Sequence, residues 1–268
     1  MNKKVLIIII VAVVVIAAAI GVYLIFSGGD YSVYTKAFKN TFDVNSMELN
    51  TSVKASVDGG SSITSTGSFM VKDINGNTQF VNDMNMDGRN ILQFSDGEFI
   101  YTDDGQNKNK VRLGGDPEPK QQERQGEDFS FDAYISEFSS LLDASKIKEL
   151  NAFEPVAEKF VDKIESSSVN GGKKFIVTLL PAAVDELVDT FLSENLSDKN
   201  MSPTIVINSI VYSATVVSNY ISEISFKIDM DITAPGESTV KRATVDFVIN
   251  PVNPGQQVRF DLPDTDEY

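Results

Sequence analysis

The stretch NMDGRNILQFSDGEFIYTDDG, residues Asn85 to Gly105, predicts the fold more directly than any other part of this sequence. Its short β-prone runs are separated by Asp-Gly pairs, which readily adopt the positive φ angles of tight hairpin turns. Similar pairs continue upstream, so that five turn signals recur at spacings of 8 to 17 residues. They are Asp58-Gly59, Asn75-Gly76, Asp87-Gly88, Asp96-Gly97 and Asp104-Gly105. This rhythm predicts an antiparallel meander rather than βαβ units.

The segments around this meander alternate between apolar and polar side chains. Alternation is clear from Met47 to Val57, and it returns at 220–232 and 243–249. A period of two is typical of strands that bury one face, and antiparallel sheets are built from such strands. A further strand is expected from Lys173 to Leu180, after the turn Asn170-Gly171-Gly172. The last alternating residues, expected to close the sheet, are Val258, Phe260 and Leu262.

Helical periodicity is found in four other segments. The first is a short helix at 30–42 with Asp30 as its N-cap. Two more patterns cover 131–142 and 147–164, with a break near Pro155, and a fourth helix opens at Pro181. The apolar faces of these helices need burial. The predicted fold class is therefore α+β, a large curved antiparallel β-sheet (half-barrel) with helices on its concave face, preceded by one transmembrane helix.

The N-terminal region predicts a membrane anchor. Residues 5–26 form a run of 22 without a charge, and at about 1.5 Å per helical residue they reach ~33 Å, enough for a hydrocarbon core of ~30 Å. A cleaved signal peptide is the alternative, but its apolar part usually spans only ~7–15 residues. Lys3 and Lys4 place residues 1–4 in the cytoplasm by the positive-inside rule. Residues 30–268, with a flexible loop at 114–128, are then expected outside the cell membrane.

Charge and composition exclude several classes of function. The chain carries 23 basic and 38 acidic residues, and without Lys3 and Lys4 the net charge falls from −15 to −17. That field repels the phosphates of nucleic acids, so no nucleic-acid partner is expected. The sequence has no histidine and no cysteine. Because the usual general base, thiol nucleophile and transition-metal ligands are missing, we expect neither an enzyme nor a cofactor or metal.

One motif suggests calcium at first reading. Asp83-Met84-Asn85-Met86-Asp87-Gly88 matches the opening of an EF-hand loop, which needs a bidentate glutamate at its twelfth position. Phe94 stands there instead, and the flanking segments are predicted strands rather than helices. The favoured interpretation is a strand with polar residues on its solvent face, followed by a turn at Asp87-Gly88.

The order of these segments resembles that of the LolA-like envelope proteins, which include the lipoprotein carrier LolA and the mycobacterial lipoproteins LppX and LprG. The shared order is an anchor, a helix, a meander with Asp-Gly turns, a helical insertion and further strands, and Asn85 to Gly105 is the most suggestive stretch. The resemblance implies a half-open barrel whose apolar cavity, covered by helices, holds acyl chains. This chain lacks the anchoring cysteine of the lipoprotein members, which argues against a shuttling role.

Methionine and phenylalanine in the predicted strands supply the candidate binding residues. Methionine fills irregular space and adapts to varied apolar partners, although ordinary core packing is the alternative. The predicted function is a membrane-anchored extracytoplasmic protein that binds a lipid or another apolar ligand. The alternative is a solidly packed interaction or sensory ectodomain that acts through surface loops, with a protein partner that the sequence does not identify. The candidate ligand-binding residues are Met47, Phe80, Met84, Met86, Phe226 and Met230.

Overall fold

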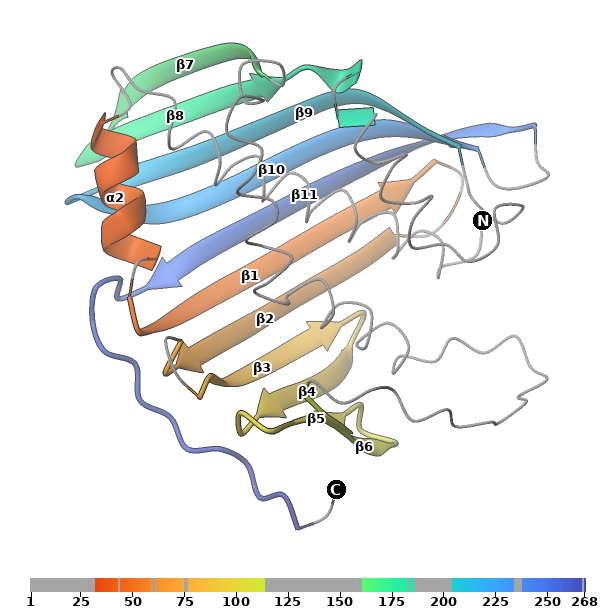
Figure 1. Cartoon of the computed structure of the whole chain (residues 1–268). Coiled ribbons are helices and arrows are strands. Elements are labelled where there is room, and N and C mark those ends of the chain that lie inside the picture. The colour runs from red at the N-terminus through yellow and green to blue at the C-terminus, as the bar shows by residue number, and fades with distance from the viewer. Residues whose placement is uncertain are drawn as a thin grey trace.

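The computed structural model describes residues 32–42, 44–58, 60, 62–74, 77–113, 161–182, 184–185, 204–233, 238–266 and 268. Within these ranges an 11-stranded antiparallel sheet lies against one helix, α2 (Ser32–Phe42), as Figure 1 shows. The strands are β1 (Ser46–Val57), β2 (Ser62–Lys72), β3 (Gln79–Met86), β4 (Arg89–Ser95), β5 (Phe99–Asp103), β6 (Lys108–Arg112), β7 (Val161–Val169), β8 (Gly172–Leu179), β9 (Thr204–Val217), β10 (Tyr220–Thr233) and β11 (Val240–Val252).

Two meanders make up the sheet. The strand order is β6-β5-β4-β3-β2-β1-β11-β10-β9-β8-β7, so sequence neighbours pair everywhere except where β1 meets β11. The predicted Asp-Gly corners lie at hairpin turns, and Asp87 and Gly88 have φ angles of 50° and 83° between β3 and β4. The antiparallel pairing predicted from these corners therefore agrees with the structure.

The strand registers divide the side chains between two faces, because directly paired residues point to the same side of a sheet. One row runs through Met86, Ser65, Val53, Phe247 and Phe226, on β3, β2, β1, β11 and β10 in turn. We call the face that carries this row the inner face, and it is the face that α2 contacts. The opposite side is called the outer face.

The main core lies on the inner face, chiefly on β8 to β11 but including Ala55 and Val57 of β1 and Ile63 of β2, and α2 packs against part of it. Tyr34 and Ala37 of the helix are buried, and Tyr34 packs against Phe175 and Tyr212. The hydroxyl groups of Tyr34 and Tyr212 hydrogen-bond to each other. Burial raises the pKa of both phenols above the ordinary value, so they remain neutral. Phe38 packs against the same core from the next turn of the helix. The apolar face expected of the helix at 30–42 is thus buried in its described part, α2.

A second, smaller core lies on the outer face. Phe94 and Tyr101 are paired across β4 and β5 and stack with ring centroids 4.8 Å apart. The segment after β11 crosses this face in an extended conformation: Phe260 packs against the cluster, and the Tyr268 ring stands edge-on to both Phe94 and Tyr101. Lys72 donates a hydrogen bond to the Phe260 carbonyl at 2.9 Å. In Figure 1 this segment leaves the end of β11 and passes along the β1 to β4 side of the sheet.

The predicted fold class is wrong in its helices. The structure shows a large antiparallel sheet with one short helix in its described part, not a set of helices on a concave face behind a transmembrane helix. Residues 5–26, predicted as the anchor, lie outside the described residues, as do the loop at 114–128 and the helix at 131–142. None of the described helical segments has the length and apolar character needed to cross a bilayer.

Three strand predictions also need correction. Residues 161–164 belong to β7 and not to a helix, and β9 had not been anticipated as a strand at all. Val258, Phe260 and Leu262 form no strand; their alternation is that of an extended segment lying over the outer face. The helix predicted from Pro181 is described only in its first turn, up to Asp185.

Candidate functional site

All six candidate binding residues lie on the inner face. Met47 on β1 and Phe80 on β3 both pair with Val71 of β2, one from each side. Met84 pairs with Gly67 and Met86 with Ser65 on the same strand. Phe226 and Met230 occupy the inner face of β10, where they pair with Phe247 and Ala243.

The structure nevertheless separates the six into two groups. Phe226 and Met230 are only 2% and 0% exposed, within the main core. Met47, Phe80 and Met84 are partly exposed. Four strand spacings separate β3, which carries Phe80 and Met84, from β10, or ~19 Å at the usual spacing between strands. The candidate site is therefore built from Met47, Phe80 and Met84, with Met86 at its border, where Met86 packs against the main core. Phe226 and Met230 lie within that core.

Two neighbours of this group were not among the predicted residues. Leu49 of β1 pairs with Phe69 of β2 on the inner face, and both side chains are partly exposed. Their alternate positions put them on the same face as Met47, but only the strand order shows that Phe69 also adjoins Phe80 and Met84 on the next strand. Together these six residues form what we call the inner apolar patch: Met47, Leu49, Phe69, Phe80, Met84 and Met86.

Gly67 makes the surface of the patch shallow at its centre. A Cβ atom on Gly67 would lie 3.0 Å from the Met84 Cγ, 3.0 Å from the Asp83 carbonyl oxygen and 3.3 Å from the Thr51 hydroxyl. Those distances are tighter than ordinary van der Waals contact. Glycine thus leaves room for the Met84 side chain to lie across β2, and any larger residue would displace it.

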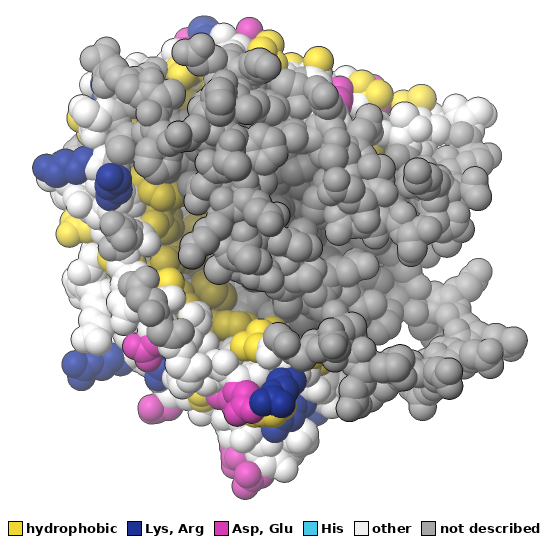
Figure 2. Space-filling view, viewed as in Figure 1, with side chains coloured by type: hydrophobic (Ala, Val, Ile, Leu, Met, Phe, Trp, Pro, Cys, Tyr) yellow, Lys and Arg dark blue, Asp and Glu magenta, His cyan; other side chains and the backbone are white. Residues whose placement is uncertain are grey.

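Hydrophobic side chains are visible on this face of the molecule in Figure 2, which has the same viewpoint as Figure 1. Those in view gather beside lysine, arginine and acidic side chains at the edge of this face. Among the described residues of β1 to β6, the inner face holds one charged side chain, Arg89, at the exposed start of β4. The electrostatic character of the patch is therefore neutral.

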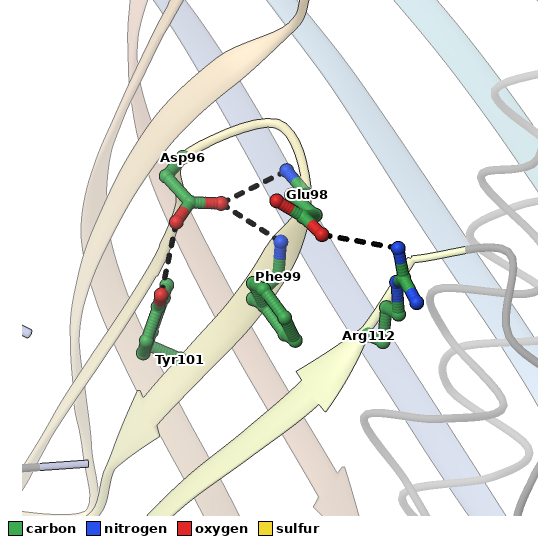
Figure 3. A network of polar contacts seen from close by, with 5 residues as sticks. All are labelled: Asp96, Glu98, Phe99, Tyr101 and Arg112. Carbon is green, nitrogen blue, oxygen red and sulfur yellow. Dashed lines mark hydrogen bonds and ion pairs between the residues drawn. The ribbon is translucent and has the colours of Figure 1, made fainter.

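The most connected polar cluster lies at the corner between β4 and β5 and is drawn in Figure 3. Asp96 accepts hydrogen bonds from the backbone N–H groups of Glu98 and Phe99, each at 2.8 Å, and from the Tyr101 hydroxyl at 2.9 Å. Burial tends to raise the pKa of Asp96, but these hydrogen bonds outweigh it and hold the pKa below its ordinary value. Glu98 forms an ion pair with Arg112 at 3.1 Å. Each bond of Asp96 holds the turn in place, so we assign the cluster a structural role.

The calcium-like motif is also a turn. Asn85 accepts a hydrogen bond from the Gly88 N–H at 3.1 Å, and Asp87 accepts one from the Thr64 N–H at 2.9 Å. Asp83 and Asn85 point to the outer face while Met84 points to the inner face. In the part of the chain that the structure covers, no three acidic side chains converge in a way that could hold a metal ion.

Comparison with known proteins gives only distant likenesses. No family model and no curated protein matches the chain. Among solved structures, a LolA superfamily protein from Nitrosomonas europaea aligns over 88% of this chain and 96% of its own, at 9% identity and a TM-score of 0.27. A β-barrel-like protein of a domain of unknown function from Brucella abortus aligns over 77% and 98%, at 9% identity and a TM-score of 0.19. Scores this low carry no argument, so the LolA-like resemblance stays a prediction.

Proposed function

We propose that this protein binds an apolar ligand, such as a lipid acyl chain, on the inner apolar patch. The observation that carries the proposal is the contrast between the two halves of one sheet face. In the main core the large side chains are fully buried, as Phe175, Phe226 and Met230 show. On β1 to β3 the inner face also holds large apolar side chains that remain partly exposed, such as Met47, Phe69 and Phe80, although Val71 between them is buried.

Partly exposed apolar area of this kind costs free energy, at roughly 25 cal/mol for each Å² left in water. Large exposed apolar patches on soluble proteins usually mark a binding surface. The methionines suit this role because the flexible thioether side chain adapts to ligands of varied shape. Gly67 supports it too, because it leaves Met84 free to lie flat across β2.

The nature of the patch also indicates the class of ligand. Its six side chains carry no charge, and the described inner face of β1 to β6 offers only Arg89 to a charged group. An ionic ligand would therefore lose its hydration without gaining a partner. A hydrocarbon chain meets no such cost, which favours an acyl group over a metabolite with several charges.

A pair of lysine substitutions tests the proposal. Met84→Lys places a charge in the centre of the patch, whereas Thr66→Lys adds the same charge to an exposed position on the outer face of the neighbouring strand. Binding of a fluorescent acyl probe should be saturable for the unaltered chain and for Thr66→Lys. For Met84→Lys the dissociation constant should rise at least tenfold, because burying a charge against the chain costs more than about 1.4 kcal/mol.

Equal affinity in both lysine variants would contradict the proposal, as would an unaltered chain that binds no probe. Thermal unfolding of each variant provides the control for folding, since a chain that loses the sheet would lose binding for an unrelated reason. The location predicted from the sequence, outside the cell membrane, stays a prediction, and so does the absence of enzymatic activity.

A further inference from the structure

A row of uncharged polar side chains crosses the inner face beside the apolar patch. Asn82 of β3 pairs with Gln93 of β4, Gln93 pairs with Thr102 of β5, and Thr102 pairs with Asn109 of β6. Directly paired residues in an antiparallel sheet have Cβ atoms ~4.5–5.5 Å apart. The four side chains therefore form a continuous line, which we call the polar row.

Apolar residues border the polar row. On β3, Asn82 lies between Phe80 and Met84, which point to the same face two residues away on either side. In the direction across the strands, Asn82 pairs with Phe69, and Phe69 pairs with Leu49. One straight line across the sheet thus passes from polar side chains on β3 to β6 to apolar side chains on β2 and β1.

The centre of the polar row is buried. Gln93 is 4% exposed and Thr102 is 5% exposed. Within the described part of the chain, neither side chain has a hydrogen-bond partner, and no polar side-chain atom there is both fully enclosed and unpaired. The small exposed area of Gln93 and Thr102 therefore includes their polar atoms. A glutamine amide brings two N–H donors and a carbonyl acceptor, and these accessible groups can pair with the polar groups of a ligand.

The row also lacks a charge that could pair with an ionic head group. Arg89, the charged residue on the described inner face of these strands, precedes Gln93 by four positions on β4, which is ~13 Å along a strand. Among the described residues of the inner face, a carboxylate or phosphate placed on Gln93 would find no counter-charge within hydrogen-bond reach. A neutral head group with a carbonyl and a hydroxyl, in contrast, offers one acceptor and one donor. These can pair with the amide of Gln93 and the hydroxyl of Thr102.

We infer that the polar row binds the uncharged head of an acyl lipid, with the acyl chain over Phe69 and Leu49. The ligand class is a neutral amphiphile whose ester or amide carbonyl is followed by a hydroxyl or N–H group, as in a monoacylglycerol. The Gln93 amide donates to the carbonyl, and its own carbonyl accepts from the ligand hydroxyl. This inference rests on the proposed function, because it assumes that the chain of the ligand occupies the inner apolar patch.

The test is a competition experiment on the full chain with an uncharged hydrocarbon probe, diphenylhexatriene. Monooleoylglycerol should displace the probe from the unaltered chain at a lower concentration than oleate does, although both carry the same acyl chain. In Gln93→Met and Thr102→Val the affinity for monooleoylglycerol should fall about tenfold, while affinity for the probe is unchanged. Thr66→Val, the same substitution at an exposed position on the outer face, should change neither.

The possible results separate this inference from the proposed function. If the unaltered chain binds no probe, the proposed function fails and the inference falls with it. If the probe binds but oleate competes as well as monooleoylglycerol, or if both inner-face variants keep the preference, the inference alone is overturned. Thermal unfolding guards against damage to the fold: because no side-chain hydrogen bond that holds the fold among the described residues depends on Gln93 or Thr102, the apolar replacements should leave the melting temperature nearly unchanged.

Discussion

The hydroxyl pair of Tyr34 and Tyr212 shows how a single contact holds α2 on the sheet. Both phenols are buried, and each is the hydrogen-bond partner of the other. Tyr34→Phe should lower the free energy of unfolding by about 1–3 kcal/mol, because it leaves the Tyr212 hydroxyl buried without a partner. The double variant Tyr34→Phe with Tyr212→Phe should be more stable than Tyr34→Phe alone, since neither ring then carries an unpaired hydroxyl. Chemical denaturation of the three proteins measures this, and a double variant less stable than the single one would contradict it.

The lowered pKa of Asp96 predicts that the free energy of unfolding depends on pH in the acid range. Its pKa is lower in the folded chain than the ordinary value, so Asp96 stabilises the fold fully above pH ~4, and this contribution is lost as the pH falls through the folded pKa. Asp96→Ala should cost about 1 kcal/mol at pH 7, a modest value because the carboxylate is largely solvated. The difference from the unaltered chain should shrink below pH 4. Asp83→Ala, at an exposed position on the outer face, provides the control. A difference that stays constant down to pH 2 would contradict the assignment.

The extended segment after β11 is expected to stabilise the sheet through Phe260. Phe260 packs against the outer-face core, and the Lys72 ammonium lies 4.6 Å from the centre of its ring. Arg259, the preceding residue, is exposed. Phe260→Ala should therefore lower the free energy of unfolding by about 1–3 kcal/mol through lost burial and lost cation–π contact, while Arg259→Ala should leave it within about 0.5 kcal/mol. Equal losses in urea denaturation would mean that this segment does not lie on the sheet as described.

Where elements were mispredicted, a bulge is the usual reason. In β9 the inner-face residues Ile205 and Ile207 are followed by Ile210 and not by residue 209, because the register shifts between them. Asp185 accepts a hydrogen bond from the Ile207 N–H at 2.7 Å beside this shift. A bulge changes the period by one residue, so the strand lacks the strict alternation that identified β10 and β11.

The same cause made β7 resemble a helix. Val161 and Ile164 are three positions apart, which is a helical spacing. A register shift between Val161 and Lys163 instead places both apolar residues against the same core within a strand. The segment from Val258 to Leu262 is the opposite case. Its side chains alternate strictly, but the segment lies over a face of the sheet and does not pair with a strand. Local periodicity cannot distinguish these two cases.

For the whole molecule, the sequence could predict the meander and the polarity of its faces but not the pairing of β1 with β11. That contact joins residues almost two hundred positions apart, such as Val53 and Phe247, and no local signal specifies it. The same contact sets the distance between Met84 and Phe226, which is why alternation placed the six candidate residues on one face but could not separate the patch from the core. Among the described residues, the predicted helix fails at 161–164, where amphipathic periodicity was taken as sufficient evidence for a helix.

The central claim is that the inner face of β1 to β3 holds an apolar ligand, and adjacent residues on opposite faces of β3 test it most directly. Because the chain contains no cysteine, Met84→Cys and Asp83→Cys can each carry one environment-sensitive fluorophore such as acrylodan. On titration with monooleoylglycerol, the label at position 84 should show a saturable change in emission, while the label at position 83 should show none. Saturable changes of similar size at both positions, or no change at position 84, would contradict the claim.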